Sequence, residues 1–243
     1  MSAVAAEHFT VPDFDPHRTQ LLVFDWDGTL MDSVATIVAC TQAALCDIGL
    51  GELPEATIRN TIGLGLRETA EILHPGCDDE LFARIMESYR KHWFGGGYRD
   101  RPVLFRGVGP MLQALADEGF LLAVATGKSR RGLDHVLTQT GLDGVFQATR
   151  TVDEAFSKPH PQMLLDILED LGVKAEEALM IGDTTFDLQM ARNARTASLG
   201  VCSGSHCREE LEQLDPVACL EGVVELPDWF AAVRADAVSG VPS

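Results

Sequence analysis

The sequence predicts an α/β fold in which helices cover both faces of a mostly parallel sheet. Short, continuous apolar runs at residues 21–24, 121–125 and 178–181 are typical of parallel strands buried on both faces. From residue 106 onward, such runs alternate with segments of helical periodicity, which indicates βαβ units. Residues 34–94, in contrast, carry helical signals and no strand. We therefore expect a Rossmann-like core of three layers, with a small all-helical cap domain inserted after its first strand.

The expected elements follow the chain in order. Residues 1–19 contain two prolines and no clear period, so we expect a loosely held N-terminal arm. Ser33 is expected to cap the first helix, and the run Gly95, Gly96 and Gly97 to end the helical block. The core is expected over 20–33 and 102–243, and the cap over 34–101. Strands are expected over 21–24, 121–125, 145–148, 178–181 and 197–201. Helices are expected over 33–49, 54–60, 66–73, 79–94, 108–118, 131–140, 161–171 and after Asp187 through 194, with an amphipathic segment over 228–233.

The composition narrows the possible functions. Of the 243 residues, 46% are hydrophobic and 23% charged, as in an ordinary globular protein. The formal net charge of −18 argues against nonspecific nucleic-acid binding, which needs Lys and Arg to neutralise phosphates. No apolar run is long enough to span a membrane, and the first residues lack the pattern of a secretory signal. We therefore expect a cytoplasmic protein with no nucleic-acid or membrane partner.

The cysteines form neither a disulfide pattern nor a complete zinc-binding motif. Six cysteines without paired spacing predict reduced thiols, not a disulfide scaffold. Cys202, His206 and Cys207 lie close together in the sequence, as in some zinc sites, but no fourth ligand follows at a usual spacing. We therefore do not favour a zinc site.

The stretch DWDGT places two carboxylates at the end of the first strand. Open α/β sheets bind ligands at this edge, where Asp25 and Asp27 are expected to converge. Two such carboxylates repel each other unless a cation or a shared proton intervenes. Mg²⁺ suits oxygen ligands and attracts phosphate, while one carboxylate remains free to attack phosphorus. Alone, the motif would more often be a solvated turn; as a functional site it predicts metal-assisted phosphoryl transfer.

Three further motifs fall at the same predicted edge. Thr126 and Gly127 end a strand, and their hydroxyl and N–H groups can bind phosphate oxygens. Lys158 offers a compact positive charge, although an isolated lysine is usually exposed. Asp183 and Asp187 follow another strand and could share a metal, or they could simply cap the next helix. Their joint occurrence favours a phosphoryl-transfer site over four unrelated turns.

These motifs, in this order, resemble those of the haloacid dehalogenase superfamily over residues 20–225. The stretches GTLMDS, TIGLGLRE and LFRGV resemble its phosphoglycolate phosphatase-like subgroup, whose helical cap lies between the first two motifs. Trp26, between the two aspartates, and Lys128, after the second motif, depart slightly from the pattern. The resemblance implies that Asp25 is the nucleophile and Asp27 the acid and base. It also implies that Mg²⁺ is held by Asp25, the Asp27 backbone carbonyl and Asp183. Asp187 would complete the metal site by orienting the bound waters or by acting from just outside the ligands. Thr126, Gly127 and Lys158 would bind the phosphoryl group.

The cap is expected to select the substrate. Gly63, Leu64 and Gly65 resemble the cap loop that faces the active site in this subgroup. Arg67 could pair with a substrate carboxylate or a second phosphate, or be a surface or structural arginine. Arg130 and Arg131 could add positive potential at the mouth, although a solvated helix face is the simpler interpretation. No catalytic role is expected for His74, His92, His135 or His160.

The predicted function is that of a Mg²⁺-dependent phosphatase. Its partner would be a small phosphorylated metabolite, either phosphoglycolate-like or a sugar phosphate, cleaved through an aspartyl-phosphate. The second aspartate favours phosphate chemistry over dehalogenation, because a dehalogenase needs no acid for its leaving group. A phosphomutase of the β-phosphoglucomutase type shares every core motif, and a noncatalytic interaction protein could keep the fold. The sequence leaves the physiological substrate and the oligomeric state open.

Overall fold

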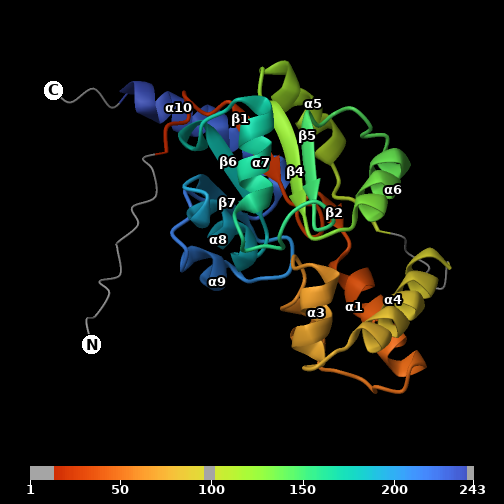
Figure 1. The fold of residues 1–243 in the computed structure, drawn as a ribbon. Helices are drawn as coiled ribbons and strands as arrows, with labels where there is room; N and C mark the ends of the chain where they lie inside the picture. Colours follow the sequence, from red (N-terminus) through yellow and green to blue (C-terminus); the bar gives the residue numbers. More distant parts are fainter. Residues whose placement is uncertain (1–13, 96–101, 240–243) are drawn as a thin grey trace, which may run out of the picture.

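The computed structural model describes residues 14–95 and 102–239, and it confirms the α/β fold. Six parallel strands form one sheet in the order β5-β4-β1-β6-β7-β8, so the first strand lies inside it (Figure 1). The strands are β1 (Leu21–Phe24), β4 (Leu121–Thr126), β5 (Ala148–Thr151), β6 (Ala178–Gly182), β7 (Ala197–Val201) and β8 (Cys219–Leu220).

Helices cover both faces of this sheet, which gives the three predicted layers. Because successive strand residues point to opposite faces, Leu22 and Phe24 enter one apolar cluster while Leu21 and Val23 enter another. The first cluster packs against α5 (Val108–Asp117), α6 (Arg130–Thr140) and α10 (Leu226–Ser239), and the second against α7 (Gln162–Leu171) and α8 (Thr185–Asn193). Three short helical elements complete the core: α9 (Arg208–Glu212) and the 3₁₀ turns Ala175–Glu177 and Val223–Glu225.

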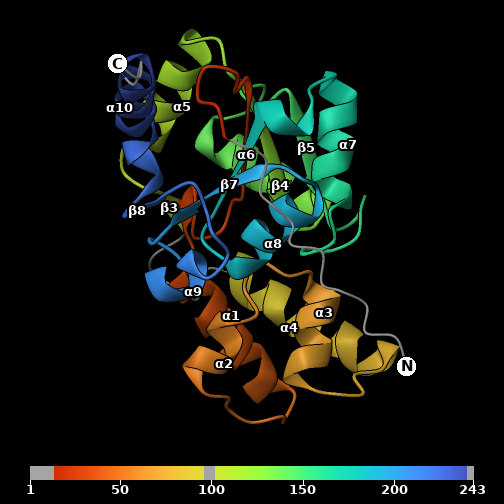
Figure 2. The ribbon, with the colours of Figure 1, turned by 90° about the vertical axis from the view of Figure 1, so that its left-hand side faces the viewer.

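A separate group of four helices follows the first strand. These are α1 (Val34–Asp47), α2 (Glu55–Arg59), α3 (Leu66–Leu73) and α4 (Asp79–Phe94), with α3 and α4 at the predicted bounds. Figures 1 and 2 show them together at one end of the sheet. We call them the helical unit and propose that it is the cap domain of residues 34–101. Of these, 96–101 lie outside the described residues, as do Gly96 and Gly97.

Two short strands join the helical unit to the core. Strand β2 (Met31–Asp32) pairs antiparallel with β3 (Val103–Leu104). The two strands lie where the chain leaves the core and where it returns, so the pairing holds both crossings together. Two-residue strands carry no periodicity, which explains why the sequence did not reveal them.

The bounds of one predicted strand need correction. The strand predicted over 145–148 lies at Ala148–Thr151 instead. The apolar signal came from Val145 and Phe146, which pack against the core from the preceding turn, where Phe146 meets the edge of Trp26. The edge strand itself is partly polar, as an outer strand of a sheet can be.

The described end of the N-terminal arm is held firmly. The Phe14 ring stacks on Trp229 of α10 with centroids 5.5 Å apart, and Arg234 donates to the Pro16 carbonyl at 3.1 Å. The sequence predicted a loosely held arm because its two prolines and lack of a clear period gave no sign of the contact made by Phe14. Residues 1–13 lie outside the described part. No described helix has both the length and the apolar character needed to cross a membrane.

Candidate active site

Neighbouring strands bring polar residues to one edge of the sheet. Strand β1 lies in parallel register between β4 and β6. Asp25, Thr126 and Asp183 therefore come together at their carboxyl ends, and all three are buried. The Asp25 N–H donates to the Ile181 carbonyl at 2.9 Å and continues the β1–β6 pairing by one residue. This pairing fixes the Asp25 side chain next to β6.

Three carboxylates form a cluster at this edge. Asp25, Asp183 and Asp187 each offer an oxygen, and these atoms all lie within 4.8 Å of one another. Asp183 is held on both oxygens: the Thr29 hydroxyl and the Ser205 N–H donate to them at 2.8 Å each. The contribution of Ser205 was not foreseen from the sequence.

Asp187 joins the cluster from the first turn of α8. The Thr184 hydroxyl and N–H donate to Asp187 Oδ2 at 2.7 and 3.1 Å, in a capping box. Its other oxygen, Oδ1, lies 2.6 Å from Lys158 Nζ. Asp187 thus uses Oδ2 at the helix cap and Oδ1 in the acidic cluster, so one side chain has both of the roles that the sequence left as alternatives.

Lys158 lies between two members of the cluster. Its Nζ is 2.6 Å from Asp25 Oδ1 and 2.6 Å from Asp187 Oδ1, and its side chain is fully buried. Burial opposes the charge, but the carboxylates of Asp187 and Asp25 outweigh this effect and raise the pKa of Lys158 above its ordinary value. The lysine is therefore not an exposed surface residue but a buried cation in the acidic cluster.

One ammonium does not balance three buried carboxylates. Burial raises the pKa of Asp25 to about 7, against the attraction of Lys158 and with the repulsion of Asp187. The pKa of Asp183 is also raised, by burial first and then by the charges of Asp25 and Asp187. An additional positive charge would favour the ionised forms of all three.

The cluster also has a free ligand atom. Asp25 Oδ2 is buried and receives no hydrogen bond from the described part of the chain. A buried carboxylate oxygen without a donor is costly, and hard oxygen donors in excess of positive charge suit a divalent cation such as Mg²⁺. Asp25, Asp183 and Asp187 therefore fit a metal ion of this kind.

Asp27 departs from the expected convergence. Its carboxylate is not part of the cluster, because Oδ1 accepts from the Ser33 hydroxyl at 2.6 Å and Oδ2 lies 2.8 Å from Lys128 Nζ. Trp26 between the two aspartates is fully buried in the core, so the two carboxylates leave the turn in different directions. A metal contact through the Asp27 side chain is not supported by this arrangement, whereas one through its backbone carbonyl remains a prediction.

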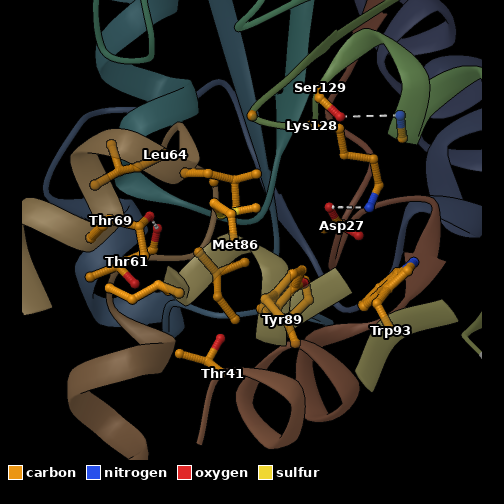
Figure 3. A pocket seen from close by; sticks show the side chains of 18 of the residues that line it. Asp27, Thr41, Thr61, Leu64, Thr69, Met86, Tyr89, Trp93, Lys128 and Ser129 are labelled. Atoms are coloured by element: carbon orange, nitrogen blue, oxygen red, sulfur yellow. Dashed lines mark hydrogen bonds and ion pairs between the residues drawn. The ribbon is translucent and has the colours of Figure 1, made fainter. Parts of the chain in front are cut away.

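Ser33 and Lys128 are the residues that the sequence analysis underestimated. Ser33 was expected to cap α1, and it stands at that position, but its hydroxyl makes no cap bond and serves Asp27 instead. Lys128 was noted only as a departure after Thr126. It lies over the Trp93 ring of α4, 5.0 Å from the centroid, while it contacts Asp27 (Figure 3). The only signal for these contacts in the sequence was that Ser33 lies six residues after Asp27 and that Lys128 lies two residues after Thr126.

The core touches the cap loop at Gly127. A Cβ built there would lie 2.5 Å from the Leu64 carbonyl oxygen and 2.7 Å from that of Gly63. Only a glycine allows this approach between β4 and the cap loop. Gly65 is held as well, because its N–H donates to the Ser157 hydroxyl at 2.7 Å. The predicted loop therefore faces the core next to Thr126.

Arg67 does not lie at the site. It pairs with Asp79 at 3.0 Å, lies over the Phe82 ring at 5.0 Å from its centroid, and is half exposed. Its side chain is absent from the walls of the cavity described below. The alternative of a structural arginine agrees with this placement, because Asp79 and Phe82 already provide its partners.

The remaining candidates divide between the rim and the surface. Arg130 is taken up by Asp134 and Glu154 at 3.1 and 2.6 Å, whereas Arg131 is exposed at the cavity rim. His206 Nδ1 accepts from the Thr185 N–H at 3.0 Å. Among the described residues, the three aspartates form the only metal-type cluster, so the zinc pattern of Cys202, His206 and Cys207 is not assembled.

The site opens into a cavity of about 530 Å³ between the core and the helical unit (Figure 3). Asp25, Asp27, Thr126 and Gly127 form its floor, and Gly63 and Leu64 from the cap loop are among its walls. A substrate held there would have its reacting end at the carboxylates and its remainder among the helices.

Comparison with known proteins decides the family. A model of the haloacid dehalogenase-like hydrolase family matches residues 22–201. The chain belongs to this family.

The chain is also similar to individual phosphatases. It is 34% identical over 209 residues to the "probable phosphatase IndB" of Dickeya dadantii, covering 85% of this chain and 91% of that protein. It is 31% identical to a phosphoglycolate phosphatase of Psychrobacter arcticus, covering 87% and 95%. A hydrolase structure from Pseudomonas syringae aligns with a TM-score of 0.80 at 25% identity, covering 88% and 99%. The predicted family and hydrolase class are thus confirmed.

Proposed function

We propose that this family member is a Mg²⁺-dependent phosphatase that cleaves a phosphomonoester through an aspartyl-phosphate. The observation that supports it most is the floor of the cavity. There Asp25 has one oxygen bound to Lys158 at 2.6 Å and a second, buried oxygen that receives no hydrogen bond from any described residue. Such a carboxylate is oriented by one contact and still has an oxygen available for attack or for a cation. The phosphatase names of the two relatives support the same reaction class.

The first step is the attack of Asp25 on phosphorus. A bond forms between its carboxylate oxygen and phosphorus, and the bond from phosphorus to the ester oxygen breaks. Asp27 gives a proton to the leaving alkoxide, so the alcohol departs neutral. Thr126 and Gly127 bind the phosphoryl oxygens, and Lys158 offsets the negative charge near the nucleophile.

The second step is hydrolysis of the aspartyl-phosphate. Asp27 takes a proton from water, the water oxygen attacks phosphorus, and the bond to Asp25 breaks to release inorganic phosphate. Ser33 and Lys128 hold one oxygen of Asp27 each, which keeps the carboxylate directed to this position.

A bound Mg²⁺ would offset the charge of the phosphoryl group and of the acidic cluster. Asp25, Asp183 and Asp187 would hold it, together with the Asp27 backbone carbonyl. Thr29 and Ser205 orient Asp183 for this purpose, since hydrogen bonds to a ligating carboxylate fix its direction.

Phosphate release from a panel of small phosphomonoesters tests the proposal, with Mg²⁺ and with a chelator. We expect turnover that requires the metal and disappears in Asp25→Asn, while the exposed Glu52→Gln keeps wild-type rates. Acid quenching during turnover followed by mass spectrometry should find phosphate on the Asp25 peptide. Isomerisation of a sugar phosphate without net phosphate release would favour the mutase instead. Turnover that survives Asp25→Asn would refute the assigned nucleophile.

A further inference from the structure

The cavity continues well beyond the space needed for a phosphoryl group. Asp25, Asp27 and Thr126 occupy only its floor, and the rest of its 530 Å³ extends between the four helices of the helical unit. Ligand sites for sizeable organic molecules have volumes of about 300–1,000 Å³. The cavity therefore has room for an alcohol portion much larger than a two-carbon acid.

Two apolar clusters of the helical unit line the upper part of this cavity. One cluster lies along α1, α2 and α3, and the other joins α1, α3 and α4. Both contribute to the cavity wall, one through Ile58, Ile62 and Leu73 and the other through Leu45, Ala70 and Ile85. Four small helices would normally close such surfaces against each other, because protein interiors pack densely. Here Leu53 packs against both clusters, yet both still leave apolar side chains open to the cavity, and we call the space that they line the cap chamber.

Few polar groups line the cap chamber. Two of them are hydrogen-bonded to the backbone, whereas His74 Nε2 is buried without a partner in the described part of the chain. The Thr61 hydroxyl donates to the Ile58 carbonyl at 2.7 Å, and the Thr69 hydroxyl to the Thr61 carbonyl at 3.3 Å. Burial raises the pKa of Tyr89 well above its ordinary value, so its hydroxyl keeps its proton and can still form a hydrogen bond. These few groups could return only part of the hydrogen bonds that a substrate with many hydroxyls would lose to water.

Charged groups are confined to the floor and the rim. Lys128 already pairs with Asp27 at 2.8 Å, and Arg67 lies outside the chamber. Arg90 and Arg131 line the cavity but are exposed. No described cation is thus buried in the upper chamber to receive a substrate carboxylate, as phosphoglycolate would require.

An aromatic surface lies between the chamber and the acid. Tyr89 and Trp93 of α4 stack with ring centroids 5.9 Å apart and planes 18° from parallel. Figure 3 shows Met86, Tyr89 and Trp93 projecting from α4 into the cavity, with Trp93 nearest to Lys128 and Asp27. A flat or branched apolar group attached to the phosphate would meet this surface directly.

We infer that the substrate is a phosphate monoester of a largely apolar alcohol, aromatic or branched, whose body fills the cap chamber. The inference rests on the proposed phosphatase function and narrows its substrate class. It departs from the phosphoglycolate-like or sugar phosphate substrate that the sequence suggested.

A series of phosphate monoesters tests this inference on the full-length protein with Mg²⁺. Methyl, propyl, pentyl, benzyl and 2-naphthylmethyl phosphate are compared with phosphoglycolate and glucose 6-phosphate. We expect kcat/KM to rise by about fourfold for each buried methylene, and to be lowest for the two polar substrates. Equal or higher kcat/KM for phosphoglycolate or glucose 6-phosphate would overturn the inference and leave the phosphatase intact.

Two variants link the preference to the chamber. Ala70→Leu places extra bulk inside it, and the matched Ala83→Leu adds the same side chain on the exposed face of α4. We expect the kcat/KM ratio of 2-naphthylmethyl to methyl phosphate to fall at least tenfold in Ala70→Leu only. An unchanged ratio would show that the apolar group binds elsewhere.

Binding separates this inference from the proposed function. If no phosphomonoester is hydrolysed, the phosphatase proposal fails, and calorimetry with 2-naphthylmethyl and methyl phosphonate still tests the chamber. Tighter binding of the naphthyl compound, lost in Ala70→Leu and kept in Ala83→Leu, would support an apolar ligand. Equal affinity for the two phosphonates would overturn it.

Discussion

Neutralising one aspartate of the acidic cluster should stabilise the metal-free protein. Three buried carboxylates share one ammonium, and the pKa of Asp25 rises from an ordinary 3.8 to about 7, chiefly because of burial. At 1.36 kcal/mol for each tenfold change in proton affinity, this rise corresponds to roughly 4 kcal/mol. Asparagine resembles the neutral form of the aspartate, so Asp25→Asn should recover most of this free energy at high pH.

The sign and the pH window follow from the two states of Asp25. In the unfolded chain its carboxyl loses a proton near pH 4, whereas in the fold its pKa is about 7. Below pH 4 both states hold the proton and ionisation costs nothing. As the pH rises from about 4 to 7, the wild type loses stability relative to Asp25→Asn, and the difference is complete above about pH 7.

Thermal unfolding in a chelator, measured from pH 4 to 8, tests this reasoning. At pH 8 we expect Asp25→Asn to melt about 10 °C above the wild type, and the gap to close toward pH 4. Glu52→Gln, an exposed carboxylate changed in the same way, should melt with the wild type. Mg²⁺ should raise the wild-type melting temperature more than that of Asp25→Asn. If the two proteins melt together at pH 8 in the chelator, the cluster does not carry the uncompensated charge that we infer.

Two glycines provide further tests. A Cβ on Gly204 would lie 1.9 Å from Asp183 Oδ2, so Gly204→Ala should cost about 2–3 kcal/mol and reduce the stabilisation by Mg²⁺ in thermal unfolding. Gly109→Ala, with no atom within 4 Å of the new Cβ, is the control and should not lower stability. A Cβ on Gly127 would lie 2.5 Å from the Leu64 carbonyl oxygen, so Gly127→Ala should lower kcat/KM by about a hundredfold while the melting temperature stays within a few degrees. Wild-type kcat/KM in Gly127→Ala would show that the two loops need not touch.

The convergence of the carboxylates was predictable because a parallel sheet brings its strand ends to one edge. Apolar runs located β1, β4 and β6, and the polar residues after them had to meet there. The structure accordingly brings Asp25, Thr126 and Asp183 together, although they are far apart in the sequence. Lys158 joins them from a loop, where only its occurrence with the other motifs distinguished it from a surface lysine.

Other parts of the site depend on side-chain directions that no periodicity reports. Asp27 turns to Ser33 and Lys128 because Trp26 fills the core between the two aspartates. Ser205 reaches Asp183 from a loop with no recognisable pattern. Asp79 on the next helix holds Arg67 away from the cavity. This contact depends on how α3 packs against α4, which the sequence does not specify.

The cap chamber and the acidic cluster together suggest why the two steps of the proposed reaction stay in order. In the proposed reaction, an apolar alcohol that fills the chamber would exclude water from Asp25 while the ester bond is cleaved, and the low dielectric would strengthen the contact with Lys158. The second step needs a water at phosphorus, so it can begin only when the alcohol has left. On this account, Lys128 keeps Asp27 in place across both steps. It contacts the acid from the core and the Trp93 ring from the helical unit, so the docking of the unit and the direction of the acid are coupled through one side chain.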